Sequence, residues 1–279
     1  MRKKILITIS GVLAVSVLCF IVIFVISVNQ AKNIVRLIDE QDYDGLEDAC
    51  ESALFIDKIP TSSRIASALC EINVWTPLQV ACSNNDIDAV TILLENGANP
   101  NKTPPFQLPW YAPIQIAASN GNVDIMTVLI ENGADVELYG HNALILLTKN
   151  ARSAKNGISI EIYKSGYALL EKCGMNASHP SFEQRPLLCE SALLSDIEVT
   201  EFLVSEKGIP IAVCDSEGRT LLHFACLSGF TDPQNEYIQY LLDHGVDHTI
   251  KDVYGKTAYD YAVESGCAEI SDLLNCTPC

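Results

Sequence analysis

Basic residues are scarce in this sequence. The 279-residue chain has 18 lysines and arginines against 35 aspartates and glutamates, a formal net charge of −17. Residues 1–28 hold three of the bases and no acid, so residues 29–279 carry 15 bases against 35 acids, a net charge of −20. Such a domain repels nucleic-acid phosphates, and we expect no nucleic-acid partner. The charge favours solubility, and it also favours attraction of a cationic partner.

Catalytic patterns are also missing. We find no paired nucleophile and base, and no glycine-rich phosphate loop after a strand. His244 and His248 are four residues apart, but Gly245 and Val246 indicate a helix end between them, which breaks the geometry of a helical zinc pair. The sequence therefore predicts a protein that is not an enzyme, with no catalytic residue, no metal site and no cofactor. A metal- or thiol-dependent activity is the disfavoured alternative.

Two segments are near copies of each other. Residues 76–101 read TPLQVACSNNDIDAVTILLENGANPN, and residues 112–137 read APIQIAASNGNVDIMTVLIENGADVE. Twelve of the 26 aligned positions are identical without a gap. An internal repeat of this length indicates stacked supersecondary units, which present surfaces more often than catalytic clefts.

Each copy predicts two short helices. In the first copy, Thr76 is a good N-cap and Pro77 suits the first helical position. A polar turn, residues 84–86, separates this helix from a second one with apolar residues at helical spacing, namely Ile87, Val90, Leu93 and Leu94. Gly97 follows where a left-handed C-cap is expected. One helix pair cannot bury its apolar face alone, so the pairs must stack.

The segments TPLQVA, LLENGAN, APIQIA and LIENGAD resemble the ankyrin repeat family. The resemblance implies an all-α solenoid of helix-turn-helix units with hairpin fingers. Gln79 and Gln115 stand where that family usually has histidine, and glutamine can replace its hydrogen bonds at the helix start. A fainter copy begins near Asp215 and has the histidine, His223; another follows from Asp252.

These units give the expected domain boundaries. We assign residues 72–274 to an ankyrin repeat domain of about five units, with a basic insertion near residues 149–164. Residues 29–71 are expected to form a degenerate N-terminal capping repeat and a linker, because a terminal unit must present a polar outer face. The predicted capping unit, residues 31–55, consists of two amphipathic helices with a polar break. Residues 275–279 are a C-terminal tail.

The N-terminus predicts a membrane anchor. A short basic tail, residues 1–4, precedes 24 uncharged residues, 5–28, which are long enough for a transmembrane helix. A cleaved signal peptide is the alternative, but VISVNQA offers no small-x-small cleavage site, so an uncleaved signal-anchor is favoured. The basic residues before the span favour a cytoplasmic N-terminus and an extracytoplasmic repeat domain, with a cytoplasmic repeat domain as the alternative.

Ten cysteines lie beyond the predicted span, which permits disulfides outside the cytoplasm. The resemblance places Cys82 and Cys226 at buried positions of the first helix, so we expect packed thiols there. Cys276 and Cys279 form a terminal C-x-x-C pair without a second ligand pair, which leaves a local or intermolecular disulfide open and disfavours a metal.

The resemblance also implies where a partner binds. In that family the finger tips and the first helices line the recognition surface, and aromatic and arginine side chains commonly anchor interfaces. The candidate residues are Trp75, Phe106, Trp110, Tyr111, Tyr139, His141, Arg219 and Tyr254. Packing against neighbouring fingers is the alternative role for Trp75 and Trp110.

The predicted function is a non-catalytic protein-protein interaction scaffold displayed at a membrane through residues 5–28, with another protein as its partner. The alternative is a structural or envelope-associated repeat protein without a discrete partner. A fold of this kind hosts unrelated targets, so the sequence does not name the partner.

Overall fold

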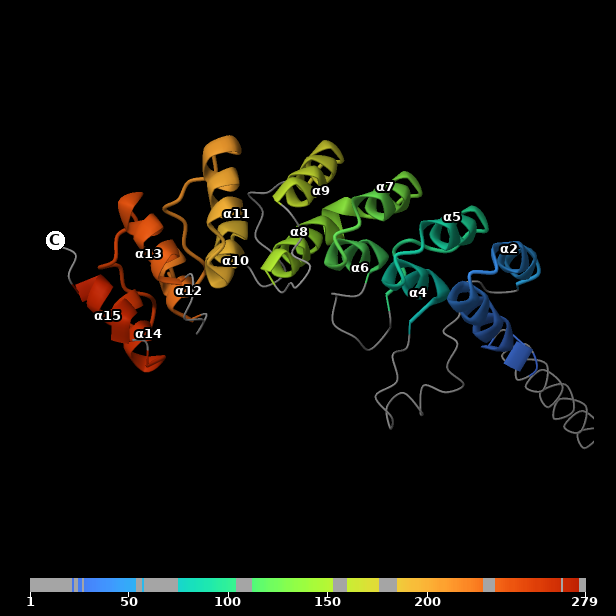
Figure 1. Cartoon of the computed structure of the whole chain (residues 1–279), viewed down its shortest axis with the longest axis horizontal. Coiled ribbons are helices and arrows are strands. Elements are labelled where there is room, and N and C mark those ends of the chain that lie inside the picture. The colour runs from blue at the N-terminus through green and yellow to red at the C-terminus, as the bar shows by residue number, and fades with distance from the viewer. Residues whose placement is uncertain are drawn as a thin grey trace, which may run out of the picture. The chain divides into compact units, whose positions relative to one another are not determined.

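The structure is a computed structural model of the whole chain. It describes residues 22, 25–26, 28–53, 57, 75–103, 112–152, 160–175, 185–227, 234–266 and 268–275. The chain divides into two compact units: unit 1 contains residues 1–117 and 124–134, and unit 2 contains residues 118–123 and 135–279. The described residues of both units are helical, as Figure 1 shows, apart from turns and one isolated antiparallel bridge between Cys214 and Thr220.

Unit 1 begins with a helix over residues 28–40 and continues with α2 (Tyr43–Glu51). Ile34, Leu37 and Leu46 are among the residues that these two helices bury. The expected pair of amphipathic helices is therefore confirmed. The polar break falls at residues 41–42, where the Asp42 side chain caps α2 by accepting a hydrogen bond from the Gly45 amide.

The first of the near-identical segments forms α4 (Pro77–Ser83) and α5 (Ile87–Glu95), which pack on each other. Thr76 is the N-cap of α4 and Pro77 its first residue, as expected. Gly97 has a φ of +87°, which other residues rarely adopt. The second segment forms α6 (Pro113–Ser119) and α7 (Val123–Glu131). The predicted helix pairs are therefore confirmed.

Glutamine takes the place of histidine at the start of α4 and α6. The Oε1 atom of Gln79 accepts a hydrogen bond from the Thr76 amide at 2.7 Å, and the Oε1 atom of Gln115 accepts one from the Ala112 amide at 2.9 Å. Both glutamines are buried. Each side chain thus pairs a buried backbone N–H that a helix start leaves without a partner.

Unit 2 starts with α8 (Val136–Arg152) and α9 (Ile160–Lys172), which pack together. The first of these helices is already formed at Val136, directly after the end of the second near-identical segment. Both ends of the insertion expected near residues 149–164 are helical, since α8 continues to Arg152 and α9 begins at Ile160. Residues 153–159 lie outside the described residues.

The next helices of unit 2 are α10 (Leu187–Leu194), α11 (Ile197–Glu201) and the π-helix η2 (Phe202–Glu206), followed by α12 (Leu221–Leu227), α13 (Gln234–Asp243), α14 (Ala258–Glu264) and α15 (Ala268–Asn275). The first helices stack, with α10 on α8 and on α12, and α12 on α14. The second helix α13 packs on α12 and α15. Two layers of helices therefore run through unit 2 (Figure 1).

The π-helix places an aromatic ring between two others. Phe202 contacts Tyr163 and Tyr167 of α9 edge-to-face, with ring centroids 5.9 Å and 5.3 Å apart. The Nζ atom of Lys207 lies 4.5 Å from the Tyr167 ring centroid and bonds the Glu171 carboxylate at 2.6 Å. These contacts hold η2 against α9.

No helix among the described residues is long and apolar enough to cross a membrane. Residues 5–28 lie outside the described part, apart from 22, 25, 26 and 28. The predicted membrane span therefore stays a prediction.

Candidate functional site

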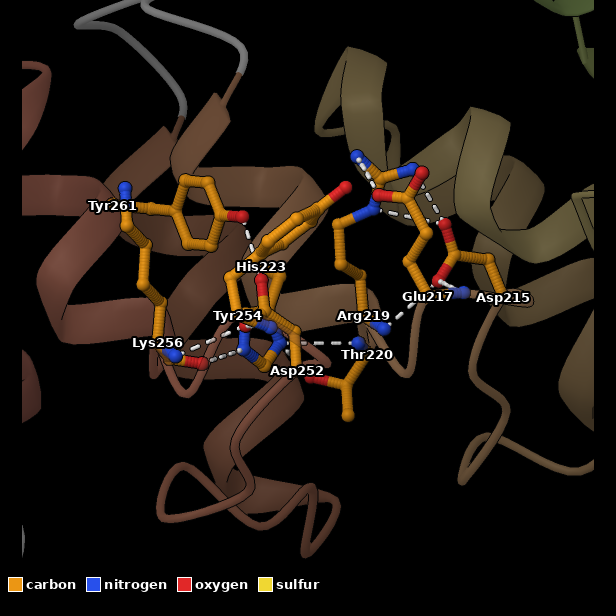
Figure 2. Close-up of polar contacts among 9 residues, drawn as sticks. All are labelled: Asp215, Glu217, Arg219, Thr220, His223, Asp252, Tyr254, Lys256 and Tyr261. Carbon is orange, nitrogen blue, oxygen red and sulfur yellow. Dashed lines mark hydrogen bonds and ion pairs between the residues drawn. The ribbon is translucent and has the colours of Figure 1, made fainter.

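Two successive fingers of unit 2 are closed by aspartates in the same way (Figure 2). In the first, the Oδ1 atom of Asp215 accepts hydrogen bonds from the amides of Glu217 and Arg219, at 2.9 Å and 2.8 Å. The Asp215 amide donates to the Arg219 carbonyl at 3.1 Å. Gly218 completes the turn with a φ of +75°. One carboxylate thus fixes the backbone of the whole turn.

The second finger repeats this arrangement at Asp252. Its Oδ1 atom accepts hydrogen bonds from the amides of Tyr254 and Lys256, both at 2.9 Å. The hydroxyl of Tyr261 in α14 donates to the other oxygen, Oδ2, at 2.6 Å. This hydrogen bond, together with burial, raises the pKa of Tyr261 to about 12. The last finger is therefore fixed to the helix that follows it.

His223 of α12 connects the two fingers. Its Nδ1 atom accepts a hydrogen bond from the Thr220 amide at 3.0 Å, and its Nε2 atom lies 3.1 Å from the Lys256 carbonyl oxygen (Figure 2). The Val253 amide also donates to the Glu217 carbonyl at 2.9 Å. A ring that accepts at Nδ1 and donates at Nε2 is neutral. The neutral imidazole thus sets the position of one finger relative to the next.

The Arg219 side chain forms its ion pairs within its own finger. Its Nε and Nη2 atoms donate to the Oδ2 atom of Asp215 at 2.8 Å and 2.6 Å, and its Nη1 atom lies 3.1 Å from a Glu217 oxygen. The guanidinium also lies over the Phe224 ring, 5.1 Å from its centroid. About a quarter of the Arg219 side chain, 23 %, remains exposed. Contact with a partner would use only this remainder.

Tyr254 is the most exposed of the described candidates, with 67 % of its surface accessible. Its neighbour Val253, which the sequence did not single out, is 65 % exposed. Both occupy the tip between Asp252 and Gly255, at the positions that Ser216 and Glu217 occupy in the preceding finger. Both fingers share the pattern D-x-x-G-[R/K]-T, and this pattern could have identified Val253 as a residue of the finger tip.

The other candidates lie elsewhere. Trp75 is half-buried directly before the N-cap of α4. Tyr139 and His141 were candidates for the recognition surface, but they lie within α8 and are each only 9 % exposed. The remaining candidates, Phe106, Trp110 and Tyr111, lie outside the described residues. Within unit 2, the described structure therefore places Arg219 and Tyr254 on successive fingers, and Tyr139 and His141 within a helix.

Two further predictions concern chemistry. Cys82 and Cys226 are fully buried, which confirms the packed role expected for them. The terminal cysteines Cys276 and Cys279 lie outside the described residues. Within the described ranges, no group of three or more His, Cys, Asp or Glu side chains is arranged to hold a metal ion.

Two family models match the sequence. The model for ankyrin repeats in three copies matches residues 154–252 and 188–277, and the model for ankyrin repeats in many copies matches residues 78–130. Together these matches cover more than half of the chain. No curated protein matches the sequence.

Several solved structures share the fold. The human ASB11 ankyrin repeat domain is 20 % identical with a TM-score of 0.63, over 88 % of this chain and 98 % of that one. The ankyrin repeat domain of Bcl-3 is 15 % identical with a TM-score of 0.58, over 87 % and 97 %. A chain from the complex of the predatory endopeptidase Bd0816 of Bdellovibrio bacteriovorus with the immunity protein Bd3460 is 23 % identical with a TM-score of 0.54, over 72 % and 97 %.

Proposed function

We propose, since this chain belongs to the ankyrin repeat family, that it is a non-catalytic scaffold that binds another protein through its fingers. Ankyrin repeats generally mediate protein–protein interactions, and their stacked units offer an extended surface for them. The proposal does not depend on any one neighbour's partner, because those likenesses are below 25 % identity and concern the fold alone.

The observation that carries the proposal is the exposed tyrosine on a fixed finger. Tyr254 is 67 % exposed, while hydrogen bonds to Asp252 fix the backbone on both sides of it. A rigid aromatic side chain buries a large area on binding and loses little conformational entropy. Val253 beside it adds apolar surface to the same tip.

The scaffold is further proposed to be held at a membrane. Residues 5–28 form an uncharged run of spanning length after three basic residues, which supports a signal-anchor. The basic N-terminus favours a repeat domain outside the cytoplasm. Protease treatment of intact cells tests this orientation: the repeat domain should be digested without disruption of the membrane, and a domain that resists until the membrane is broken would reverse the assignment.

The finger surface is tested by site-specific photo-cross-linking in cells. A photoreactive amino acid at position 254 should capture one partner in high yield. The matched control is position 138, because Leu138 is 63 % exposed and belongs to helix α8 and not to a finger. Equal capture at both positions, or capture only of a second copy of the chain, would contradict the proposal and favour the structural alternative.

Binding of the captured partner then separates contact from folding. Tyr254→Ala should weaken binding about tenfold or more, the cost typical of an interface anchor. The finger hydrogen bonds of residue 254 come from its backbone, so the free energy of unfolding should stay nearly unchanged. Leu138→Ala should alter neither quantity, and a Tyr254→Ala variant that binds as tightly as wild type would exclude this finger as the anchor.

A further inference from the structure

Helix α13 presents two different faces. Its buried face carries Tyr237, Ile238 and Leu241, which pack into unit 2. The opposite face has Glu236, Tyr240 and Asp243 at spacings of four and three residues, so they lie in one stripe along the helix. α13 is the second helix of its repeat, whereas the fingers at Asp215 and Asp252 precede the first helices α12 and α14.

The stripe forms one wall of a groove. The groove lies between α13 and α15, has a volume of about 560 Å³, and includes Glu269 and Leu273 of α15 in its lining (Figure 1 labels both helices). Tyr240 and Leu273 supply apolar surface, while Glu236, Asp243 and Glu269 supply carboxylates. Among the residues that the structure describes, neither lysine nor arginine lines the groove.

Neutral side chains hold two of these carboxylates in place. The Asn235 amide nitrogen donates to Glu269 Oε2 at 3.1 Å, and the Gln239 amide nitrogen donates to Asp243 Oδ1 at 2.7 Å. Amides orient a carboxylate without cancelling its charge. The negative charge of the groove is therefore positioned and kept.

The surrounding sequence adds to this charge. Residues 220–279 contain nine aspartates and glutamates and only two basic residues, Lys251 and Lys256. Both lysines belong to the last finger, and Lys256 already bonds the Glu264 carboxylate at 2.6 Å. The two C-terminal repeats thus present an acidic surface that attracts cations over roughly a Debye length, about 8 Å at physiological salt.

Tyr240 gives the groove a fixed aromatic side chain. Its ring stacks near Tyr237, with centroids 6.3 Å apart and planes at 24°, and lies 4.1 Å from the His244 ring. Burial, with the charge of Glu201, raises the pKa of Tyr240, so its hydroxyl stays neutral at physiological pH. An aromatic wall of this kind favours a cation placed against it.

We propose that this groove is a second docking site, which binds a lysine- or arginine-rich segment of a partner protein. The cationic heads pair with Glu236, Asp243 and Glu269, and the aliphatic stems cover Tyr240 and Leu273. Lysine and arginine suit both parts of the groove because each combines an apolar stem with a charged end. The site is formed by second helices and is separate from Tyr254, so its failure would leave the finger surface untouched.

The test uses the full chain in a non-ionic detergent and a labelled peptide of about 12 residues of alternating lysine and leucine, roughly the length of a short helix. Fluorescence anisotropy measures the Kd. The groove variant is the triple E236Q, D243N and E269Q. The matched control is the triple E161Q, E198Q and D272N, which removes the same charge from exposed helical positions of unit 2 outside the groove lining.

We expect the groove variant to bind the peptide about tenfold more weakly at low salt, because it loses three exposed ion pairs that each contribute modestly to binding. The control triple should bind nearly as wild type, and a peptide with glutamate in place of lysine should not bind. Equal losses in the two triples would show diffuse charge attraction and overturn the proposal. Absence of peptide binding would also overturn the proposal. Dimerisation without peptide that the groove variant abolishes would overturn it too, because the occupant of the groove would then be a second copy of the chain.

Hydrogen exchange locates the bound peptide, which a change in affinity alone does not do. The bound peptide should slow amide exchange in α13 and α15 while leaving the finger at residues 252–256 unchanged. Protection of the finger instead would place the basic segment on the Tyr254 surface and overturn the assignment to the groove.

Discussion

The Nε2 atom of His223 lies 3.1 Å from the Lys256 carbonyl oxygen, so a side chain of one repeat contacts the backbone of the next finger. The same ring accepts a hydrogen bond from the Thr220 amide inside its own repeat. Gln79 and Gln115 make the corresponding bond to the amides of Thr76 and Ala112 at their own helix starts. Histidine and glutamine both supply the hydrogen bond at the helix start, and His223 adds a second contact that links one repeat to the next.

This comparison predicts how substitutions at His223 differ. His223→Gln should keep the bond to the Thr220 amide and lose the link to Lys256, at a cost of about 1 kcal/mol in the free energy of unfolding. His223→Ala should cost about 2–3 kcal/mol, because it also leaves the buried Thr220 amide without its acceptor. Urea denaturation followed by circular dichroism measures both. Equal losses would mean that the link to Lys256, not the helix start, carries the stability.

The neutral state of His223 predicts a pH dependence. Burial lowers the pKa of His223 below its usual range, although the Lys256 carbonyl and the Asp252 charge act in the opposite direction. The unfolded chain then binds more protons than the folded one just below pH 6.5, the usual imidazole pKa, so this contribution is present above that pH and lost as the pH falls.

The free energy of unfolding should therefore drop between pH 7.5 and 5.5, and the drop should be smaller in His223→Gln.

Carboxylates affect the free energy of unfolding in a different pH range. Hydrogen bonds from the amide and hydroxyl of Thr257 lower the pKa of Asp260, so its contribution is lost only below about pH 4. A drop of the same size in wild type and in His223→Gln would assign the pH dependence to other groups.

A buried hydroxyl network predicts a stability loss at Thr200. Three oxygen atoms lie within hydrogen-bond distance of its Oγ1 atom. They are Ser191 Oγ at 2.9 Å, the Tyr237 hydroxyl at 2.9 Å and the Asp196 carbonyl oxygen at 2.7 Å. Thr200→Val keeps the shape and removes the shared hydroxyl, which should cost about 1–3 kcal/mol. The control Thr91→Val removes an exposed hydroxyl that bonds the Ile87 carbonyl, and should stay within about 0.5 kcal/mol. Similar losses in both would show that the network contributes nothing beyond a local helix effect.

Thiol burial predicts an order of alkylation. Cys173 and Cys214 are exposed, whereas Cys82, Cys189 and Cys226 are buried. Burial also raises the pKa of Cys82 and Cys189, which keeps these thiols protonated and unreactive. Iodoacetamide labelling of the native, reduced protein, read by mass spectrometry, should modify the exposed pair first and the buried three only after denaturation. Rapid labelling of Cys82 in native protein would indicate local opening of α4.

The sequence predicted the helix pairs well where their ends carry strong local signals. Thr76, Pro77 and Gly97 each act through their own backbone geometry, so a single residue identifies the cap. The same approach failed at α8, which begins at Val136. Residues 136–152 contain no proline, and Gly140 alone does not end a helix, so the helix continues and takes Tyr139 and His141 into its buried part.

The candidate surface was predicted less completely. Tyr254 was selected as an aromatic residue on the recognition surface that the resemblance implies. Its exposure depends on a finger whose backbone is fixed by hydrogen bonds to Asp252. The acidic groove was not identified, because α13 and α15 belong to different repeats and only their packing brings Tyr240 and Leu273 together. Periodicity within one helix carries no information about which helix lies opposite.

The π-helix over Phe202–Glu206 affects how the repeats should be aligned with one another. Its Lys207 amide bonds the Phe202 carbonyl five residues earlier, at 3.2 Å, where an α-helix would bond four residues apart. A π-turn of this kind accommodates one additional residue, and the Phe202 ring still contacts Tyr163 and Tyr167. An alignment that assumes a constant period will therefore pair the wrong positions after Phe202, although the helices on either side occupy matching places in their repeats.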